Sequence, residues 1–461
     1  MFCYILLDLI DLIIFMNTVN ALSNTIENNA PVYFLKLMVE NVRCFGKTQT
    51  LNLSDGKGKP ARWTIILGDN GVGKTTLLKC LSALEPNLVQ GEQRTEPRVL
   101  WMMPKAEKIF GRHGKSDFLV QAYRLYKGWF HSKVSSIFKG YSFQSMMASS
   151  LPFNELDNFI IYAYGASRRM GNGALEESYN PNHAASLFSE EVSLINAVEW
   201  LLQALFASQN SEGDSQSYFE NRYEKVKNML IALLPDIENI RAKPVTKLHP
   251  KPTIEVETIY GWVHLRDLSL GYQTLIAWMV DLAHRLFERY PDCDNPLEQP
   301  AIVLVDEIDL HLHPKWQRTV ISHLTHIFKQ TQFIVTAHSP LIVQSAPKDA
   351  NIVLLKQQGD QVIIHNNEEI IKGWRIDQVL TSDLFDLPSA RPFEYDNYLK
   401  RQAEILSKPQ LTKADEQELE EIGKKLDELP LVFEKTSEDN EANEAMKLIR
   451  ETAALLKQVN Q

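Results

Sequence analysis

Gly68-Asp69-Asn70-Gly71-Val72-Gly73-Lys74-Thr75 is the stretch that decides the fold of this 461-residue chain. It matches the pattern GxxxxGK[ST] in full, and Thr76 follows it directly. Residues 64–67 before it have the pattern of a buried strand, and the leucine spacing of residues 75–84 after it predicts a helix. Strand, glycine-rich loop and helix follow in the order that a phosphate-binding loop requires, so we expect an α/β nucleotide-binding fold.

The residue types of this loop indicate which part of a nucleotide it would hold. Glycines allow backbone N–H groups to turn toward phosphate oxygens, and the N-terminus of the following helix adds its positive end. Lys74 is predicted to neutralise the β- and γ-phosphates, and the Thr75 hydroxyl to bind Mg²⁺. The alternative is a chance glycine turn, which the flanking strand and helix disfavour. ATP and Mg²⁺ are therefore the expected ligands, with residues 68–76 around the phosphates.

A second segment supplies acidic side chains. Residues 301–305 are apolar, read as a buried strand, and end at Asp306 and Glu307. We expect Asp306 to hold Mg²⁺ beside Thr75, directly or through water, and Glu307 to polarise the water that attacks the γ-phosphate. A strand that ends in Asp-Glu is a weak signal alone, but it is a strong one together with the glycine-rich loop.

Composition narrows the class of protein. The chain is 44% hydrophobic and 23% charged, which is ordinary for a soluble globular protein. Its net charge of −10 argues against a surface that is basic all over, so contact with DNA would need a local patch or a partner. The four cysteines have no CxxC spacing, which indicates reduced thiols and a cytoplasmic protein.

Residues 1–32 are expected to form an N-terminal extension without an assigned function. Its apolar run, residues 6–16, carries Asp8 and Asp11 and is shorter than the roughly 20 apolar residues that span a bilayer. It also lacks the basic segment of a secretory signal, so we expect no membrane association. An amphipathic helix that packs on the body is one alternative, and an upstream extension with Met16 as the working start is another.

The remaining chain divides into a head and a C-terminal segment. We expect the head over residues 33–355, with a helical insertion at about 175–250, and a C-terminal segment with an acidic helical tail over 356–461. Strands are expected at 33–41, 159–163 and 333–336, a hairpin at 253–265, and helices at 190–206, 220–234 and 411–429, the last with Thr412 and Asp415 as a capping box.

Two further motifs identify the type of nucleotide-binding protein. Leu268-Ser269-Leu270-Gly271-Tyr272-Gln273 opens a helix and resembles the LSGGQ signature of ABC ATPases. Its serine hydroxyl and helix N-terminal amides can hold a γ-phosphate. Residues 333–338 form another apolar strand, which ends in His338. Each motif alone is more often structural, but Ser269 before Glu307 and His338 after it reproduce the order of that family.

The complete set of motifs resembles the RecF, SMC-like and OLD-type ATPases rather than transporters, above all in the stretch DEIDLHLHPKWQ at residues 306–317. This resemblance implies an ABC-type P-loop NTPase head with an antiparallel β subdomain. It also implies that at least two copies of the chain sandwich ATP, each site joining Lys74 of one copy to Ser269 and Gly271 of the other. Asp309 would signal between the sites, His338 would contact the γ-phosphate, and Arg43 would lie on the nucleotide side.

The chain departs from that family in two respects. The glutamine of the Q-loop is not located, because Gln121, Gln144 and residues 164–169 are all possible landmarks. The separation of Lys74 and Ser269 is too long for a compact transporter subunit and much too short for an SMC arm, which leaves room for a modest helical insertion. A metal site at the loop histidines of residues 306–317 is disfavoured, since no cysteine lies near them.

A narrower resemblance rests on YGASRR at residues 164–169, LSLGYQT at 268–274 and the segment 373–385. These are similar to the bacterial family of predicted ATP-binding proteins involved in virulence, which includes ATPase subunits of Septu antiphage systems and retron-associated ATPases. The resemblance implies an ATPase that senses or regulates within a defence complex and scaffolds a separate HNH nuclease. We find neither a Toprim pattern nor an HNH site after His338, so the chain is not expected to cut DNA itself.

Other classes of function remain as alternatives. A RecF-like DNA-repair ATPase would act directly on DNA, and its hydrolysis would be stimulated by DNA. A transporter ATPase fits poorly, because the chain carries no fused membrane spans and the motif spacing departs from that class. An ATPase of an unrelated complex is the remaining possibility.

Overall fold

The computed structural model describes residues 31–84, 88–89, 98–99, 112, 118–126, 130–139, 142–148, 161–175, 180, 182–247, 250–367, 374–385, 387, 389–390, 394–408 and 412–427. Most of the expected N-terminal extension and the acidic tail after residue 427 lie outside these residues. The chain divides into two compact units, Met1–Asp386 and Leu387–Gln461.

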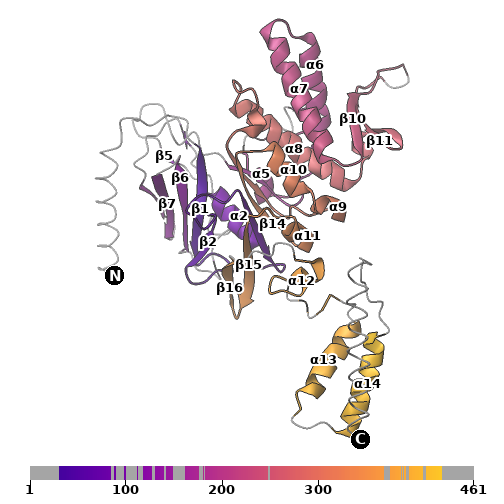
Figure 1. Ribbon diagram of the computed structural model, residues 1–461. Coiled ribbons are helices and arrows are strands. Elements are labelled where there is room, and N and C mark those ends of the chain that lie inside the picture. Colours follow the sequence, from indigo (N-terminus) through magenta and orange to yellow (C-terminus); the bar gives the residue numbers. More distant parts are fainter. Residues whose placement is uncertain are drawn as a thin grey trace. The chain divides into compact units, whose positions relative to one another are not determined.

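The first unit is built around a six-stranded sheet with the order β16-β15-β3-β14-β13-β9 (Figure 1). Its five neighbouring strands from β15 to β9 run parallel, and β16 pairs antiparallel with β15 at one edge. The sheet continues past residue 355, since β15 and β16 both contribute to it. The strands are β3 (Trp63–Gly68), β9 (Ile161–Tyr164), β13 (Ala301–Val305), β14 (Thr331–Thr336), β15 (Asn351–Gln358) and β16 (Gln361–Asn367).

The sheet is covered on both faces, which explains why its central strands are apolar throughout. Every residue of β13 and β14 is buried. Alternate side chains enter two different cores: Ile65 belongs to one hydrophobic cluster, and its neighbour Ile66 belongs to the other. A strand buried on both faces reads as a continuous apolar run rather than as an alternating one. The α/β fold class predicted from the sequence is thus confirmed.

One face packs against α2 and an antiparallel sheet with the order β2-β1-β6-β7-β8. Gln332 of β14 ties the two sheets together: its Oε1 accepts from Phe34 N, and its Nε2 donates to Phe34 O, both at 2.8 Å. The expected antiparallel β subdomain is therefore present. The elements are α2 (Lys74–Ser82), β1 (Val32–Glu40), β2 (Gln49–Asn52), β6 (Phe118–Tyr126), β7 (Phe130–Lys139) and β8 (Ser142–Ala148).

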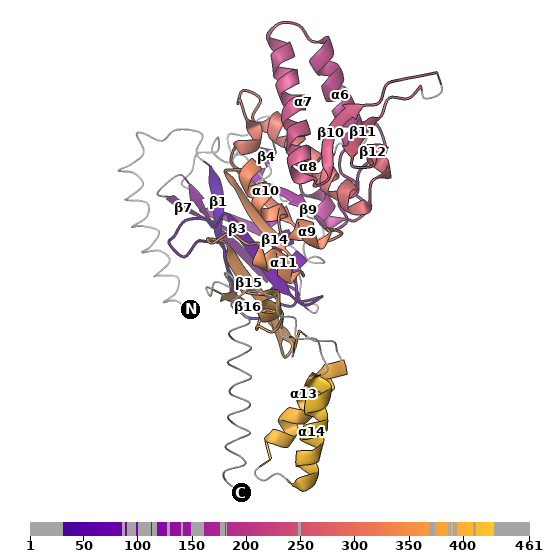
Figure 2. The same cartoon turned by 45° about the vertical axis from the view of Figure 1, so that its right-hand side comes forward.

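The other face carries the helical insertion and the helix that follows it. Helices α6 (Ala197–Asn210) and α7 (Asp214–Leu233) lie side by side and project beyond the sheet, next to α8 (Leu270–Arg289) (Figure 2). Asn196 accepts a hydrogen bond from Glu199 N at 3.4 Å and caps α6, so this helix begins later than the apolar pattern from residue 190 suggests.

Short elements complete the first unit. They are β4 (Leu88–Val89), β5 (Arg98–Val99), α5 (Ala185–Phe188), β10 (Ile237–Ala242), β11 (Ile254–Thr258), β12 (Gly261–His264), α9 (Pro314–Gln317), α10 (Val320–Ile327), α11 (Pro340–Gln344) and α12 (Ile376–Leu380), with 3₁₀ turns at Leu265–Asp267 and Pro296–Glu298.

The second unit is described over α13 (Glu394–Leu406) and α14 (Lys413–Asp427). Thr412 N donates to Asp415 Oδ2 at 2.9 Å, and Asp415 N donates to Thr412 Oγ1 at 3.2 Å, so the capping box predicted for this helix is confirmed. In the described parts of both units, no helix has the length and apolar character needed to cross a membrane.

Candidate nucleotide site

The glycine-rich loop connects β3 to α2 and depends on glycine at three positions. Gly68, Gly71 and Gly73 have φ values of 143°, 82° and 93°. Residues other than glycine rarely adopt such positive φ values. A Cβ on Gly73 would lie 2.5 Å from Cys44 Sγ, whereas a Cβ on Gly71 would meet nothing within 4 Å. The loop is therefore packed against the body at its base and open at Gly71, where space remains for phosphate oxygens.

Lys74 lies across this loop. Its Nζ donates to Gly68 O at 2.7 Å and to Asp69 O at 2.8 Å, and its residue exposure is only 6%. Burial lowers the pKa of Lys74, while the carboxylates of Glu307 and Asp306 oppose that change. The site thus combines a cation, which can bind an anionic ligand, with carboxylates, which can bind a divalent cation. A nucleotide with its Mg²⁺ supplies both partners.

Thr75 and Asp306 come together from distant parts of the sequence. The Thr75 hydroxyl donates to Asp306 Oδ2 at 2.7 Å, and Thr336 donates to Asp306 Oδ1 at the same distance. A hydroxyl beside a carboxylate is a set of hard oxygen donors, which is what Mg²⁺ prefers. These residues therefore fit the metal predicted for them.

Glu307 points into the same region as His338. Glu307 adopts a left-handed backbone conformation, with φ of 49°, directly after the end of β13. Its Oε1 lies 3.8 Å from His338 Nε2, and both side chains are about one-third exposed. The backbone N–H of His338 donates to Asp309 Oδ2 at 3.0 Å. Glu307, Asp309 and His338 are thus neighbours at the carboxyl ends of β13 and β14.

The signature residues lie at the beginning of α8, where Ser269 and Leu270 are exposed and Gly271 is buried. Ser269 is the N-cap and is exposed, and Leu270 beside it is 57% exposed. Gly271 packs closely on the stretch that contains Asp309, because a Cβ there would lie 2.3 Å from His311 O. Glycine is therefore required at this position, and the signature packs on the turn that follows Asp309.

Arg43 lies in a turn beside the glycine-rich loop. It is exposed and has a φ of 49°. The next residue, Cys44, donates from its thiol to Val72 O at 3.3 Å. This contact places the turn against the loop, although the role predicted for Arg43 concerns the nucleotide and stays a prediction.

Sequence reasoning missed two residues of this site, Arg168 and Thr336. The Thr336 hydroxyl accepts from Glu307 N at 2.7 Å in addition to its bond with Asp306. The Arg168 guanidinium donates to the backbone carbonyls of Asp306 and Glu307. The sequence feature that could have identified Arg168 is its position in YGASRR, residues 164–169, at the end of a buried strand.

These residues also bear on the position of the Q-loop. Gln121 and Gln144 lie in β6 and β8 of the antiparallel sheet. Residues 164–169 follow β9, which pairs in parallel with β13 and so ends next to Asp306. Of the three landmarks, this last segment is the one beside the carboxylates, and it contains Ser167 and Arg168 in place of a glutamine.

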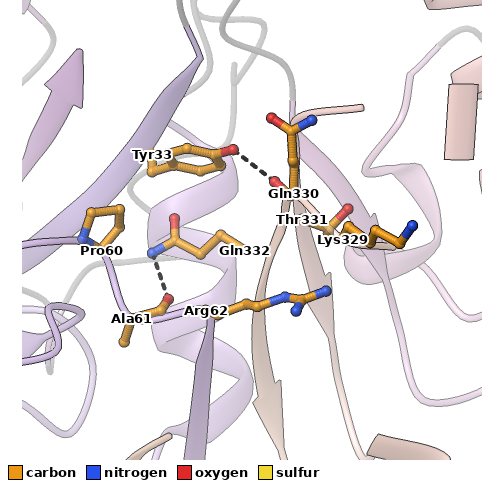
Figure 3. Close-up of a pocket in the computed structure, with 8 residues that line it drawn as sticks. All are labelled: Tyr33, Pro60, Ala61, Arg62, Lys329, Gln330, Thr331 and Gln332. Carbon is orange, nitrogen blue, oxygen red and sulfur yellow. Dashed lines mark hydrogen bonds between the residues drawn. The ribbon is translucent and has the colours of Figure 1, made fainter. Parts of the chain in front are cut away.

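A separate pocket lies at the opposite end of the sheet (Figure 3). It is formed where β3 and β14 begin, whereas the glycine-rich loop follows the end of β3. Figure 3 shows Tyr33 donating to Gln330 O, at 2.7 Å, and Gln332 donating to Ala61 O, at 3.3 Å. The Tyr33 bond links β1 to the residue before β14, so the pocket lies between the two sheets and is not part of the nucleotide site.

Known proteins are similar to this chain over several segments. A family model described as "AAA domain, putative AbiEii toxin, Type IV TA system" matches residues 138–344, and one described as "AAA domain" matches residues 36–84. The chain is 26% identical to the Septu protein PtuA of Bacillus mycoides (strain KBAB4) over 390 residues, which are 82% of this chain and 48% of that protein. The chain is similar to this PtuA over most of its own length.

Further relatives match over shorter segments. The chain is 35% identical to the "Retron Vc95 probable ATPase" of Vibrio cholerae serotype O1 biovar El Tor over 150 residues. These residues are 32% of this chain and 28% of that protein. The chain thus spans about half or less of the length of these relatives. The second of these relatives is named a probable ATPase, and both matching family models are described as AAA domains.

Solved structures with a similar arrangement include an SMC head domain from Thermotoga maritima, with a TM-score of 0.41 and 15% identity over 73% of this chain and 99% of that chain. The recombination mediator protein RecF, in an ATPrS-bound structure, has a TM-score of 0.40 and 12% identity over 73% of this chain and 99% of that chain.

Proposed function

We propose that this chain binds and hydrolyses ATP as the ATPase subunit of an antiphage defence complex. The observation that supports the ATPase activity best is the 2.7 Å hydrogen bond between the Thr75 hydroxyl and the Asp306 carboxylate. It joins the two motifs that would hold Mg²⁺, although they are far apart in sequence, beside Lys74 and Glu307. The relationship to PtuA supports the defence role.

Each residue of the site has a distinct task in this proposal. The N–H groups of residues 68–76 and the charge of Lys74 bind the phosphates. Thr75 and Asp306 would hold Mg²⁺, which supplies neutralisation of phosphate charge. Glu307 orients a water molecule and accepts its proton as the water oxygen bonds to the γ-phosphorus and the bond to ADP breaks. His338, 3.8 Å from Glu307, helps to hold that water.

The complete site would require a second copy of the chain. Ser269 is exposed at the start of α8, and Gly271, two residues further on, packs on His311, two residues after Asp309. An exposed Leu270 beside them is suited to burial between two subunits. ATP bound at Lys74 of one copy would then contact Ser269 of the other, so that ATP closes the pair and hydrolysis reopens it.

The proposed partner in defence is a separate nuclease of the HNH type. This partner follows from the resemblance to the ATPase subunits of Septu systems, in which the nuclease is a different protein. The ATP-dependent opening and closing of the pair would then control how the nuclease is held.

The test begins with phosphate release by the purified chain, with and without DNA and with a co-expressed HNH nuclease. We expect hydrolysis in the isolated chain and co-purification with the nuclease. Absence of hydrolysis in both the isolated chain and the complex would refute the ATPase proposal. Strong stimulation by DNA alone, without binding of the nuclease, would favour a RecF-like repair ATPase instead.

A further inference from the structure

Arg168 is a buried cation that directly contacts the main chain of the predicted catalytic acids. It follows β9 by four residues, is 1% exposed, and adopts a left-handed backbone conformation with φ of 36°. An arginine is rarely buried to this extent unless its donors have partners; both terminal nitrogens of Arg168 do, whereas its Nε has none among the described residues. The combination of burial and an uncommon backbone conformation therefore calls for a specific use of its guanidinium.

The guanidinium connects three backbone carbonyls. One terminal nitrogen, Nη1, donates to Gly165 O at 3.2 Å and to Asp306 O. The other, Nη2, donates to Glu307 O at 2.9 Å. The two terminal nitrogens of one planar guanidinium thus hold two adjacent peptide groups. The bond to Gly165 O also ties the guanidinium to its own turn.

These bonds act where the backbone changes direction. Glu307 has a φ of 49°, which is unfavourable for a residue with a side chain and persists only when its surroundings enforce it. Thr336 Oγ1 accepts from Glu307 N on one side, and Arg168 donates to Glu307 O on the other. Both polar groups of the Glu307 main chain therefore have a fixed partner, which sets the direction of its side chain.

We propose that Arg168 is a positioning residue for ATP hydrolysis, which holds the Glu307 carboxylate in line with the nucleotide by clamping the carbonyls of Asp306 and Glu307. The inference rests on the proposed function and deepens it. Because Arg168 is buried and its guanidinium bonds to backbone carbonyls, it acts through the main chain of the residue that activates water.

The electrostatics of the clamp support this role. Burial lowers the pKa of Arg168 to about 10, and the nearby carboxylates of Asp306, Asp309 and Glu307 oppose the change. The guanidinium therefore stays charged at neutral pH and offsets part of the repulsion among these acids. A buried water molecule could bridge the same carbonyls, but it would not supply this charge.

The geometry favours arginine over lysine. A guanidinium presents donors in a rigid plane and can bind two neighbouring carbonyls at once, whereas an ammonium is a single point of charge on a flexible stem. Arg168→Lys should therefore keep the charge and lose the two-armed clamp. Arg168→Met removes both.

Steady-state ATP hydrolysis by the full chain provides the first test. We expect Arg168→Met to lower kcat roughly 10- to 100-fold with little change in KM, because misplacement of a catalytic group by about 1 Å costs this much. Arg168→Lys should be intermediate. Arg169→Met, at the exposed neighbouring arginine, is the matched control and should retain wild-type kcat. A wild-type kcat in Arg168→Met, or a loss confined to KM, would overturn the proposal.

Hydrogen–deuterium exchange provides a second test that does not depend on hydrolysis. The amide of Glu307 is held by Thr336, so peptides that cover residues 306–309 should exchange at least roughly 10-fold faster in Arg168→Met than in wild type or Arg169→Met. Unchanged exchange there would overturn the clamp. If wild type itself does not hydrolyse ATP, the proposed function fails, while the exchange result still decides whether Arg168 holds Glu307.

Discussion

Thr336, the last residue of β14, donates its hydroxyl hydrogen to Asp306 Oδ1 at 2.7 Å. The same hydroxyl oxygen accepts from Glu307 N, also at 2.7 Å. A single buried side chain on one strand therefore positions both acids at the end of the neighbouring strand. The two parallel strands are in register at Val305 and Val335, which brings Thr336 opposite the acids.

Replacing this hydroxyl should harm both stability and hydrolysis. Thr336→Val keeps the side-chain shape but leaves a buried carboxylate oxygen of Asp306 and the part-buried amide of Glu307 without their partner. We expect the free energy of unfolding to fall by about 2–4 kcal/mol and hydrolysis to slow, since unsatisfied buried polar groups are costly. Urea denaturation and phosphate release measure the two effects.

Thr331→Val is the matched control on the same strand. Thr331 is also buried, but within the described residues its hydroxyl has no hydrogen-bond partner. The same chemical change should therefore alter stability by less than about 1 kcal/mol or stabilise the protein slightly. Equal losses in the two variants would show that the hydrogen bonds of Thr336 contribute little.

Glu307→Gln separates ATP binding from hydrolysis. The amide keeps the size of the side chain and removes its basicity, so kcat should fall roughly 100-fold or more. Binding of ATP should persist, because the Lys74 and Thr75 contacts do not involve the Glu307 side chain. Lys74→Ala, in contrast, should abolish binding. Calorimetry measures the binding of ATP, and light scattering measures assembly in its presence. Wild-type turnover in Glu307→Gln would contradict the role assigned to Glu307.

The two-copy site predicts complementation between different defects. Lys74→Ala and Ser269→Arg should each be inactive alone. Mixed, they should recover hydrolysis, because one of the two sites in a mixed pair combines an intact Lys74 with an intact Ser269. The measurement is phosphate release as a function of mixing ratio.

The control carries both substitutions in one chain. When this double variant is mixed with wild type, each site of a mixed pair has one defect, so hydrolysis should fall below that expected from simple dilution. No recovery with the single variants, combined with simple dilution by the double variant, would indicate that each chain works alone.

Acid should destabilise the first unit through two buried histidines. Burial lowers the pKa of both His183 and His284 to about 4, and the positive charge of Arg222 adds to the effect at His284. The unfolded chain binds protons near pH 6.5 while the native chain does not, so stability is retained above pH 6.5 and lost as pH falls toward 4. The loss is on the order of 1–3 kcal/mol for each histidine.

His284→Gln tests this pH dependence. Gln can still accept the hydrogen bond that Trp200 Nε1 donates to His284 Nδ1 at 3.2 Å, but it cannot take up a proton. The urea midpoint of the variant should therefore fall less steeply between pH 6.5 and 4 than that of wild type. His326→Gln, at an exposed histidine of α10, should retain the wild-type dependence.

Local patterns in the sequence predicted the strands of the nucleotide site well. The apolar run at 301–305 coincides with β13, and the strand expected at 333–336 lies within β14. Both are buried on two faces, so every residue contributes to the signal. Asp306 and Glu307 come directly after β13, and His338 comes two residues after β14. Their positions at strand ends explain why these residues could be selected before their geometry was known.

Residues that act through tertiary contacts could not be selected in this way. Arg168 bonds to carbonyls that lie far from it in sequence, and nothing in its own segment distinguishes it from Arg169. The hairpin of β15 and β16 was missed because polar residues such as Lys356 and Asn366 interrupt its apolar pattern. Asn366 accepts from Asn52 N at 2.7 Å and donates to Thr50 O at 2.8 Å, contacts that only the folded chain reveals.

The position of β3 in the sheet affects how the protein is made. Its main-chain neighbours are β14, which begins at Thr331, and β15, which begins at Asn351. A ribosome that has synthesised the glycine-rich loop must therefore add most of the remaining chain before that loop has a sheet to rest on. Until then the apolar side chains of β3 are exposed to solvent, which favours aggregation. The nucleotide site is thus encoded early and assembled late, and nascent chains should depend on chaperones during the interval.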